Sequence, residues 1–187
     1  MLINAKTEGK TSGKLFQTAF LQYYICGIDN NQLKKRTNMK FNINDTVNAQ
    51  INTELWSAYL YLSMSTYAAQ KGFNEYIEWF DNESRTKHSR AKRLISHLVS
   101  KGVEVCLYPI EEVPAKWETP LDMFKKALEY EKKISKLINT MITFAWEVKE
   151  DCTIEILSQL SEEQEKQETK IKEMIAAIEN GQETPTP

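Results

Sequence analysis

Seven polar side chains fall where four predicted helices turn toward one another. They are Glu54, Tyr61, Lys87, Arg90, Glu131, Gln164 and Gln167. Polar groups at inward positions are costly unless they pair with one another or bind a ligand. Carboxylates that project from facing helices can hold two divalent metal ions inside a bundle. A lysine and an arginine in the same set can instead pair with those carboxylates, so the pattern predicts either a metal centre or a buried ion-pair network.

Four segments with helical periodicity must position these residues. We predict helices over residues 44–70, 74–101, 120–148 and 152–179, because apolar side chains recur every three to four positions along each of them. The inward stripe of the first helix is read as Val47, Ile51, Leu55, Ala58, Leu62 and Ser65.

The ends of the helices and the long connection set the topology. Asn44 or Asp45 is predicted to cap the first helix, and Thr119 followed by Pro120 to begin the third. Residues 103–118 show no helical period, and at about sixteen residues they exceed the usual bundle connection of about two to eight. Such a length lets the second and third helices run parallel. The prediction is an all-α, up-down-down-up four-helix bundle with a long crossover and no clear fifth helix.

Charge divides the 187-residue chain into unequal parts. Residues 1–38 carry a net charge of +4, so the remainder carries −6 within a total of −2. We expect residues 1–38 to be an extension outside the fold, either disordered or translated upstream of a start at Met39. Residues 39–180 are predicted to form the bundle, and residues 181–187 a disordered tail.

Composition excludes several classes of function. The near-neutral charge gives no reason to expect a nucleic-acid partner, and no apolar stretch is long enough to span a membrane. Cys26, Cys106 and Cys152 are odd in number and widely spaced, so they form neither a disulfide framework nor a metal-binding motif. A reducing, cytoplasmic setting is expected.

Four stretches of the chain resemble bacterial non-haem ferritins. They are Glu54-Leu-Trp-Ser-Ala-Tyr-Leu-Tyr61 in the first helix, Leu107-Tyr-Pro-Ile-Glu-Glu-Val-Pro-Ala-Lys-Trp117 in the crossover, Tyr130-Glu131-Lys-Lys-Ile-Ser-Lys-Leu-Ile-Asn139 in the third helix, and Glu162-Glu163-Gln164 in the fourth. The likeness runs in order along residues 44–180, crossover included, so it is specific.

The resemblance implies an iron-storage subunit that assembles with copies of itself, as a cage of 24 subunits. It also implies non-haem iron, Fe2+ and Fe3+, and a ferroxidase centre in each bundle where two ferrous ions react with oxygen. By this resemblance Glu54, Glu131 and Gln164 stand at ligand positions, and Tyr61 stands beside the centre. Trp56 and Tyr59 lie outside the polar set and are expected to contribute to subunit contacts.

The chain departs from the ferritin pattern at three ligand positions of the two-iron centre, and also at Thr86 and Lys166, which the resemblance expects to be acidic. Lys87 and Arg90 stand where the resemblance places a Glu-x-x-His ligand pair, and Gln167 stands where it places a further acidic ligand. His88 is one residue from that register, about a hundred degrees around the helix. His97 lies one to two turns beyond the site, so neither histidine restores the missing ligand.

These departures favour an impaired oxidation centre. Lys87 and Arg90 balance Glu54 and Glu131 in charge, and Gln164, Gln167 and Tyr61 are expected to bridge the network. Such a subunit resembles the light chains of animal ferritins, with oxidation left to a possible catalytic co-subunit. Two alternatives stay open: an active ferroxidase, and a structural or regulatory oligomer without iron.

Overall fold

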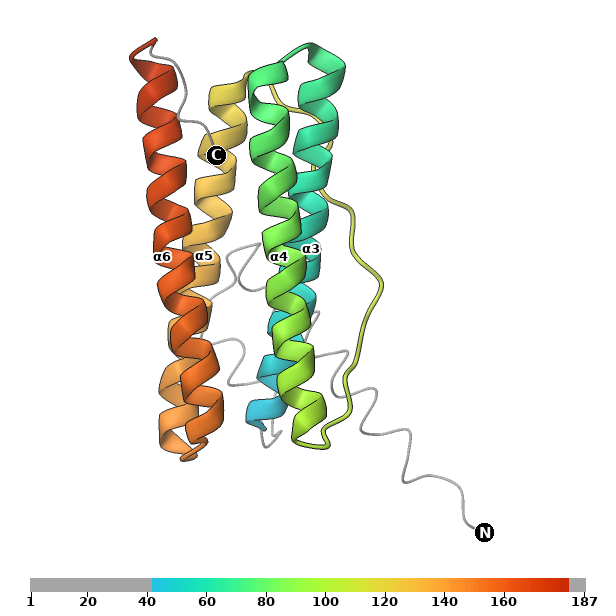
Figure 1. Cartoon of the computed structure of the whole chain (residues 1–187), viewed down its shortest axis with the longest axis vertical. Coiled ribbons are helices and arrows are strands. Elements are labelled where there is room, and N and C mark those ends of the chain that lie inside the picture. The colour runs from blue at the N-terminus through green and yellow to red at the C-terminus, as the bar shows by residue number, and fades with distance from the viewer. Residues whose placement is uncertain (1–41, 182–187) are drawn as a thin grey trace, which may run out of the picture.

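The computed structural model describes residues 42–181, in which four long α-helices are the only regular elements. They are α3 (Ile43–Lys71), α4 (Asn74–Ser100), α5 (Pro120–Glu147) and α6 (Asp151–Glu179), and they lie side by side as a bundle (Figure 1). The order of directions is up, down, down, up, so the predicted all-α bundle is confirmed. The expected extension at residues 1–38, and residues 182–187 of the expected tail, lie outside the described part of the chain.

The helix boundaries agree with the prediction to within about one residue, but one cap is different. Asn42, rather than Asn44 or Asp45, caps α3, because its side chain accepts a hydrogen bond of 3.1 Å from the backbone N–H of Asn44. Thr119 caps α5 as predicted, accepting from the backbone N–H of Asp122 at 3.1 Å.

The crossover between α4 and α5 is extended and is fastened along α3. The side chain of Asn48 donates to the carbonyl of Glu104 (3.0 Å) and accepts from the N–H of Cys106 (2.9 Å). One turn later Asn52 does the same with the carbonyl of Cys106 (2.8 Å) and the N–H of Tyr108 (3.0 Å). Two amide side chains thus satisfy backbone groups that a strand partner would otherwise satisfy.

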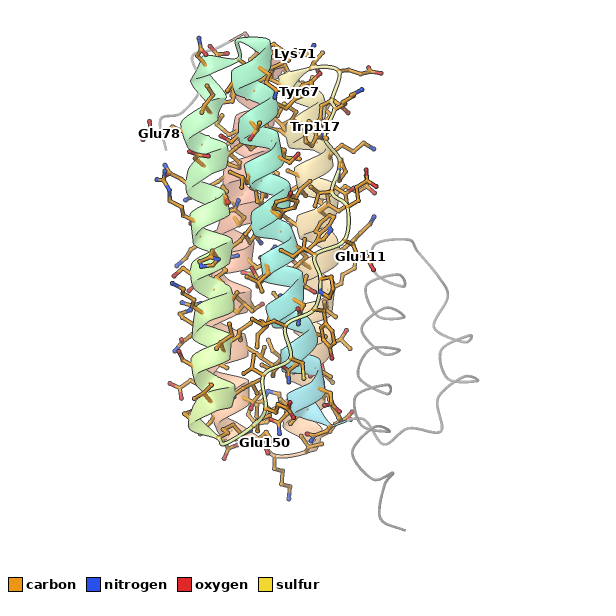
Figure 2. All side chains as sticks on the ribbon, turned by 90° about the vertical axis from the view of Figure 1, so that its right-hand side faces the viewer. Tyr67, Lys71, Glu78, Glu111, Trp117 and Glu150 are labelled. Atoms are coloured by element: carbon orange, nitrogen blue, oxygen red, sulfur yellow. The ribbon has the colours of Figure 1, made fainter. Side chains whose placement is uncertain are left out.

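Further contacts hold the rest of the crossover against the same helix. The hydroxyl of Ser63 donates to the carbonyl of Pro114 at 2.9 Å, and that of Tyr67 donates to the carbonyl of Trp117. Figure 2 shows Tyr67 and Trp117 together near one end of the bundle, with Glu150 at the opposite end. The crossover therefore spans the length of the bundle, which allows α4 and α5 to run parallel.

The apolar core is split into two clusters along the bundle axis. One is aliphatic and is built around residues such as Ile51, Leu94, Ile138 and Leu157. The other is rich in aromatic rings and includes Trp79, Phe80 and Phe124. On each helix the members of the two clusters are separated by a short stretch, which contains Glu54 on α3, Lys87 and Arg90 on α4, Glu131 on α5, and Gln164 and Gln167 on α6.

Two expectations about apolar residues need correction. Leu62 is 46% exposed, so the inward stripe of α3 is narrower than predicted, although Leu55 is half-buried and packs against the aliphatic cluster. Trp56 does not face solvent: it is 7% exposed and packs edge-on against Tyr130, with ring centroids 5.4 Å apart.

Among residues 42–181, no helix carries an apolar run that could cross a bilayer.

Candidate functional site

A layer of polar side chains crosses the bundle between the two apolar clusters. Six of the seven residues singled out from the sequence lie in it, and the seventh, Tyr61, belongs to the aromatic cluster and directs its hydroxyl into the layer; none of the seven is more than 4% exposed. They come from all four helices: Glu54 and Tyr61 from α3, Lys87 and Arg90 from α4, Glu131 from α5, and Gln164 and Gln167 from α6.

Lys87 occupies the middle of this layer. Its ammonium donates to Glu131 Oε2 at 2.7 Å and to Gln164 Oε1 at 3.2 Å. The Nζ atom also lies 3.8 Å from Glu54 Oε2, an ion-pair distance at which no hydrogen bond forms. One buried cation therefore serves two buried carboxylates, and holds one of them much more closely than the other.

Glu131 is the most fully satisfied group of the layer. Its Oε1 accepts from the Tyr61 hydroxyl at 2.6 Å, and its Oε2 accepts from Gln164 Nε2 as well as from Lys87. Burial alone would raise the pKa of Glu131, but Lys87, Tyr61 and Gln164 outweigh it and hold the pKa below its usual value. Glu131 is accordingly an anion in the folded protein.

Glu54 is held from only one side. Gln50, one turn earlier on α3 and fully buried, donates its Nε2 to Glu54 Oε1 at 2.7 Å. Among the described residues, neither Glu54 Oε2 nor Gln50 Oε1 has a hydrogen-bond partner. A buried carboxylate oxygen is thus left with the distant ammonium of Lys87 as its main compensation.

Arg90 pairs differently from the expectation. It lies one turn beyond Lys87 and reaches across to α6, where its Nε donates to Glu163 Oε2 (3.0 Å) and its Nη1 to Gln164 Oε1 (3.0 Å). Arg93 binds the same Glu163 carboxylate at 2.6 Å and 3.0 Å. Burial opposes ionisation of Glu163, but the two guanidinium groups hold its pKa below the usual value. The expected balance of Lys87 and Arg90 against Glu54 and Glu131 is therefore wrong, because Arg90 takes its counter-ion from α6.

Tyr61 and Gln167 line the side of the layer next to the aromatic cluster. Burial, followed by the charge of Glu131, raises the pKa of Tyr61 well above its ordinary value of 10.0, so the phenol stays protonated and donates. Gln167 lies close enough to Tyr61 to lower the pKa of its phenol, although within residues 42–181 no partner lies at hydrogen-bond distance from Gln167 Nε2. His88 is exposed, and His97 contacts Thr153 Oγ1 at 3.1 Å, so both histidines lie outside the layer.

Glu83 adds a third carboxylate near the layer that the sequence interpretation missed. It is 5% exposed, and its Oε2 has no hydrogen-bond partner among the described residues. Burial raises the pKa of Glu83 above 4.5, and the nearby cations Lys170 and Lys87 only partly offset this. Its position one turn before Lys87 on the same face of α4 was a signal available in the sequence, as was the position of Gln50 one turn before Glu54.

The donor set does not fit a two-metal centre in this arrangement. Within residues 42–181, no three His, Cys, Asp or Glu side chains gather so that they could hold a metal ion. Glu54 and Glu131 do face a common space, but the Lys87 ammonium lies within ion-pair distance of both of them. It supplies the positive charge that would otherwise come from a bound cation.

Replacing Glu83 by its neutral isostere tests this description of the layer. Because the folded state raises the pKa of Glu83, it favours the protonated form, and ionisation at neutral pH costs stability. Glu83→Gln should therefore raise the free energy of unfolding at pH 7.5, by on the order of 1 kcal/mol. The gain should shrink as the pH is lowered toward 4.5. Thermal midpoints across this range provide the measurement, with Glu78→Gln, an exposed change on the same helix, as the control (Figure 2). A loss of stability at pH 7.5 would contradict the assignment.

Comparison with known proteins places this geometry in a family. The family model of the ferritin-like domain matches residues 44–180. The chain is 29% identical to the bacterial non-heme ferritin of Bacteroides fragilis (strain 638R) over 136 residues, covering 73% of this chain and 86% of that protein. It is 28% identical to the Campylobacter jejuni bacterial non-heme ferritin over 132 residues, which cover 71% of this chain and 79% of that protein.

Solved structures give the same result. An open pore ferritin from the hyperthermophilic archaeon Archaeoglobus fulgidus superposes with a TM-score of 0.73 at 28% identity, covering 75% of this chain and 87% of that one. The family match extends over most of the chain and includes all four helices and the crossover. The resemblance inferred from the motifs is thereby confirmed, and the chain belongs to the ferritin family.

Proposed function

We propose that this protein is an iron-storage subunit in which a buried ion pair has replaced the two-iron oxidation centre. The observation that carries the proposal is the place of Lys87, with Nζ 2.7 Å from Glu131 Oε2 and 3.8 Å from Glu54 Oε2. A ferrous ion approaching these carboxylates meets a cation that already neutralises them. Iron is the cargo of such a subunit. It is oxidised rapidly by another subunit, or slowly without a dedicated centre.

The surroundings of the pair support this role. Tyr61 and Gln164 hold Glu131 toward Lys87, and Arg90 is fixed by Glu163 and Gln164. The layer is thus organised around its internal cations. The relatives named above are called ferritins, which supports iron storage as the task that remains.

Self-association is the second part of the proposal. Four large apolar side chains are exposed on α3 and on the crossover fastened along it: Tyr59 (50%), Leu62 (46%), Leu107 (61%) and Ile110 (47%). Apolar residues gathered on one side of a bundle suit a subunit interface. We propose that copies of the chain meet there in a closed cage, with 24 subunits as the expected number.

Converting the layer back to a ligand set should restore iron oxidation. Lys87→Glu combined with Arg90→His gives three carboxylates and an imidazole around the space now held by Lys87. We expect wild type to oxidise two added ferrous ions per subunit no faster than buffer alone, and the double variant to gain about tenfold or more. The initial rate of oxygen-dependent oxidation is the measurement. Lys92→Glu with Arg85→His, which makes the same charge changes at exposed positions of α4, is the control.

Two results would contradict the proposal. The first is rapid oxidation by wild type that disappears in Glu54→Gln, because the ion pair would then not block the centre. The second is a correctly folded double variant that gains neither iron binding nor rate.

Assembly is tested separately by the mass of the particle. Light scattering should give a mass about 24 times the 21.7 kDa subunit, because ring-shaped and cage-like oligomers close by symmetry. Leu62→Glu should weaken the particle, since it places a charge in the apolar surface, whereas Thr86→Glu on the exposed face of α4 should not. A monodisperse monomer or dimer of wild type at micromolar concentration would exclude the cage.

A further inference from the structure

Along one side of the bundle, α4 and α6 run antiparallel to each other and meet at the surface (Figure 1). Glu163 of α6 fixes their register, because it binds both Arg90 and Arg93 of α4. In antiparallel helices, the residues that precede Arg90 lie opposite the residues that follow Glu163. Burial raises the pKa of Glu83, and Lys170 is the cation that opposes this rise most. Lys170 therefore lies opposite Glu83, as the register requires.

The surface between these two helices, here called the α4–α6 flank, carries more cations than carboxylates. It is formed by seven residues at helical spacing: Thr86, Ser89, Arg90 and Arg93 of α4, and Glu163, Lys166 and Lys170 of α6. With the nearby buried Glu83, the flank has four positive and two negative charges, so two positive charges are in excess. At Thr86 and Lys166 the resemblance to ferritins expects acidic residues, so the charge of this surface is reversed.

The excess charge comes from two lysines of α6 that lack a counter-ion. Lys166 and Lys170 follow Glu163 by about one and two turns, and both are exposed. Among residues 42–181, neither of them forms an ion pair with a carboxylate. Glu168 lies between them in sequence but on the opposite side of α6, where it accepts a hydrogen bond from Ser135 of α5. An anion from outside the chain would therefore meet no competing carboxylate at these two ammonium groups.

Arg90 adds a fixed donor beneath the two lysines. Its Nε and Nη1 donate to Glu163 and Gln164 at 3.0 Å each, and its side chain is only 5% exposed. Its Nη2 has no hydrogen-bond partner in the described part of the chain, yet this nitrogen is not fully buried. A guanidinium that is held by two contacts thus presents one unused N–H group toward the flank, a geometry that suits an anionic oxygen atom.

Ser89 supplies an uncharged donor next to Arg90. It is exposed, and its hydroxyl makes no hydrogen bond to any residue between 42 and 181. Most exposed serines and lysines are simply solvated, and a single exposed ion pair is worth little. The α4–α6 flank differs because a nearly buried guanidinium, a hydroxyl and two unpaired ammonium groups converge from two helices.

We propose that the α4–α6 flank binds one inorganic phosphate ion. Its oxygen atoms accept hydrogen bonds from Arg90 Nη2, from the Ser89 hydroxyl and from the ammonium groups of Lys166 and Lys170. The two excess positive charges match the charge of a phosphate dianion. This inference goes beyond the proposed function, because an anion site on the surface of one subunit requires neither iron nor a cage.

Calorimetric titration of the full-length protein with phosphate at pH 7.5 and low salt tests the site. Wild type should bind one phosphate per subunit. Lys166→Gln combined with Lys170→Gln should weaken binding by more than about tenfold, because both ammonium donors are lost. The matched control is Lys132→Gln with Lys136→Gln, which removes two exposed lysines at the same spacing from α5 and should change the affinity less than about twofold.

A variant that keeps the charge separates a built site from general attraction. Ser89→Ala removes one donor and should weaken phosphate binding by about threefold or more. Ser96→Ala, an exposed change on the same helix, should leave it unchanged. Sulfate, which is also a tetrahedral dianion, should compete with phosphate, whereas nitrate at the same ionic strength should not.

Three results would overturn the proposal. The first is no saturable binding by wild type up to about 1 mM phosphate. The second is an equal loss of affinity in the two lysine double variants, which would show attraction by overall charge. The third is displacement of phosphate by a short DNA duplex that binds more tightly, which would make the flank a surface for polyanions. None of these results bears on the proposed function, which the iron-oxidation rate of wild type decides.

Discussion

The pairing of Lys87 with Glu131 is the interaction on which the interior of this bundle depends. Both groups are buried, and removing either one would leave the other as an unpaired charge inside the bundle. The hydroxyl of Tyr61 and the amide nitrogen of Gln164 donate to Glu131, and the amide oxygen of Gln164 accepts a hydrogen bond from Arg90. Residues of all four helices are joined in this way in one layer, which separates the aliphatic half of the core from the aromatic half.

The spacing of apolar residues predicted the fold well, because a helical period leaves few alternative structures for each segment. This spacing predicted four helices, and the length of the segment after Gly102 predicted that the second and third helices run parallel. The errors arose where a side chain could choose between neighbours. Asn42 rather than Asn44 caps α3, and Trp56 turns inward onto Tyr130 although it lies beside the predicted stripe. Such choices depend on three-dimensional packing, which spacing alone does not encode.

The sequence predicted which residues lie in the polar layer, but not which of them pair with one another. Six of the seven residues chosen from the sequence are buried in one layer, and Tyr61 directs its hydroxyl into it. Their partners could not be read from helical register, because an arginine side chain is long enough to reach either neighbouring helix, and Arg90 binds Glu163 on α6. Gln50 and Glu83 were not predicted because neither stands at a position that resembles a ferritin ligand, although each lies one turn from a predicted residue of the layer.

A double-mutant cycle on the central pair tests the account most directly. Lys87→Met and Glu131→Gln are compared singly and together, in denaturant titrations without added metal at equal subunit concentration. Each single change should cost about 3–5 kcal/mol of unfolding free energy, because it strands a buried charge. The double variant should be more stable than the sum of the two losses predicts, by more than about 1 kcal/mol. Additive losses, or single variants as stable as wild type, would show that the layer does not depend on this pair.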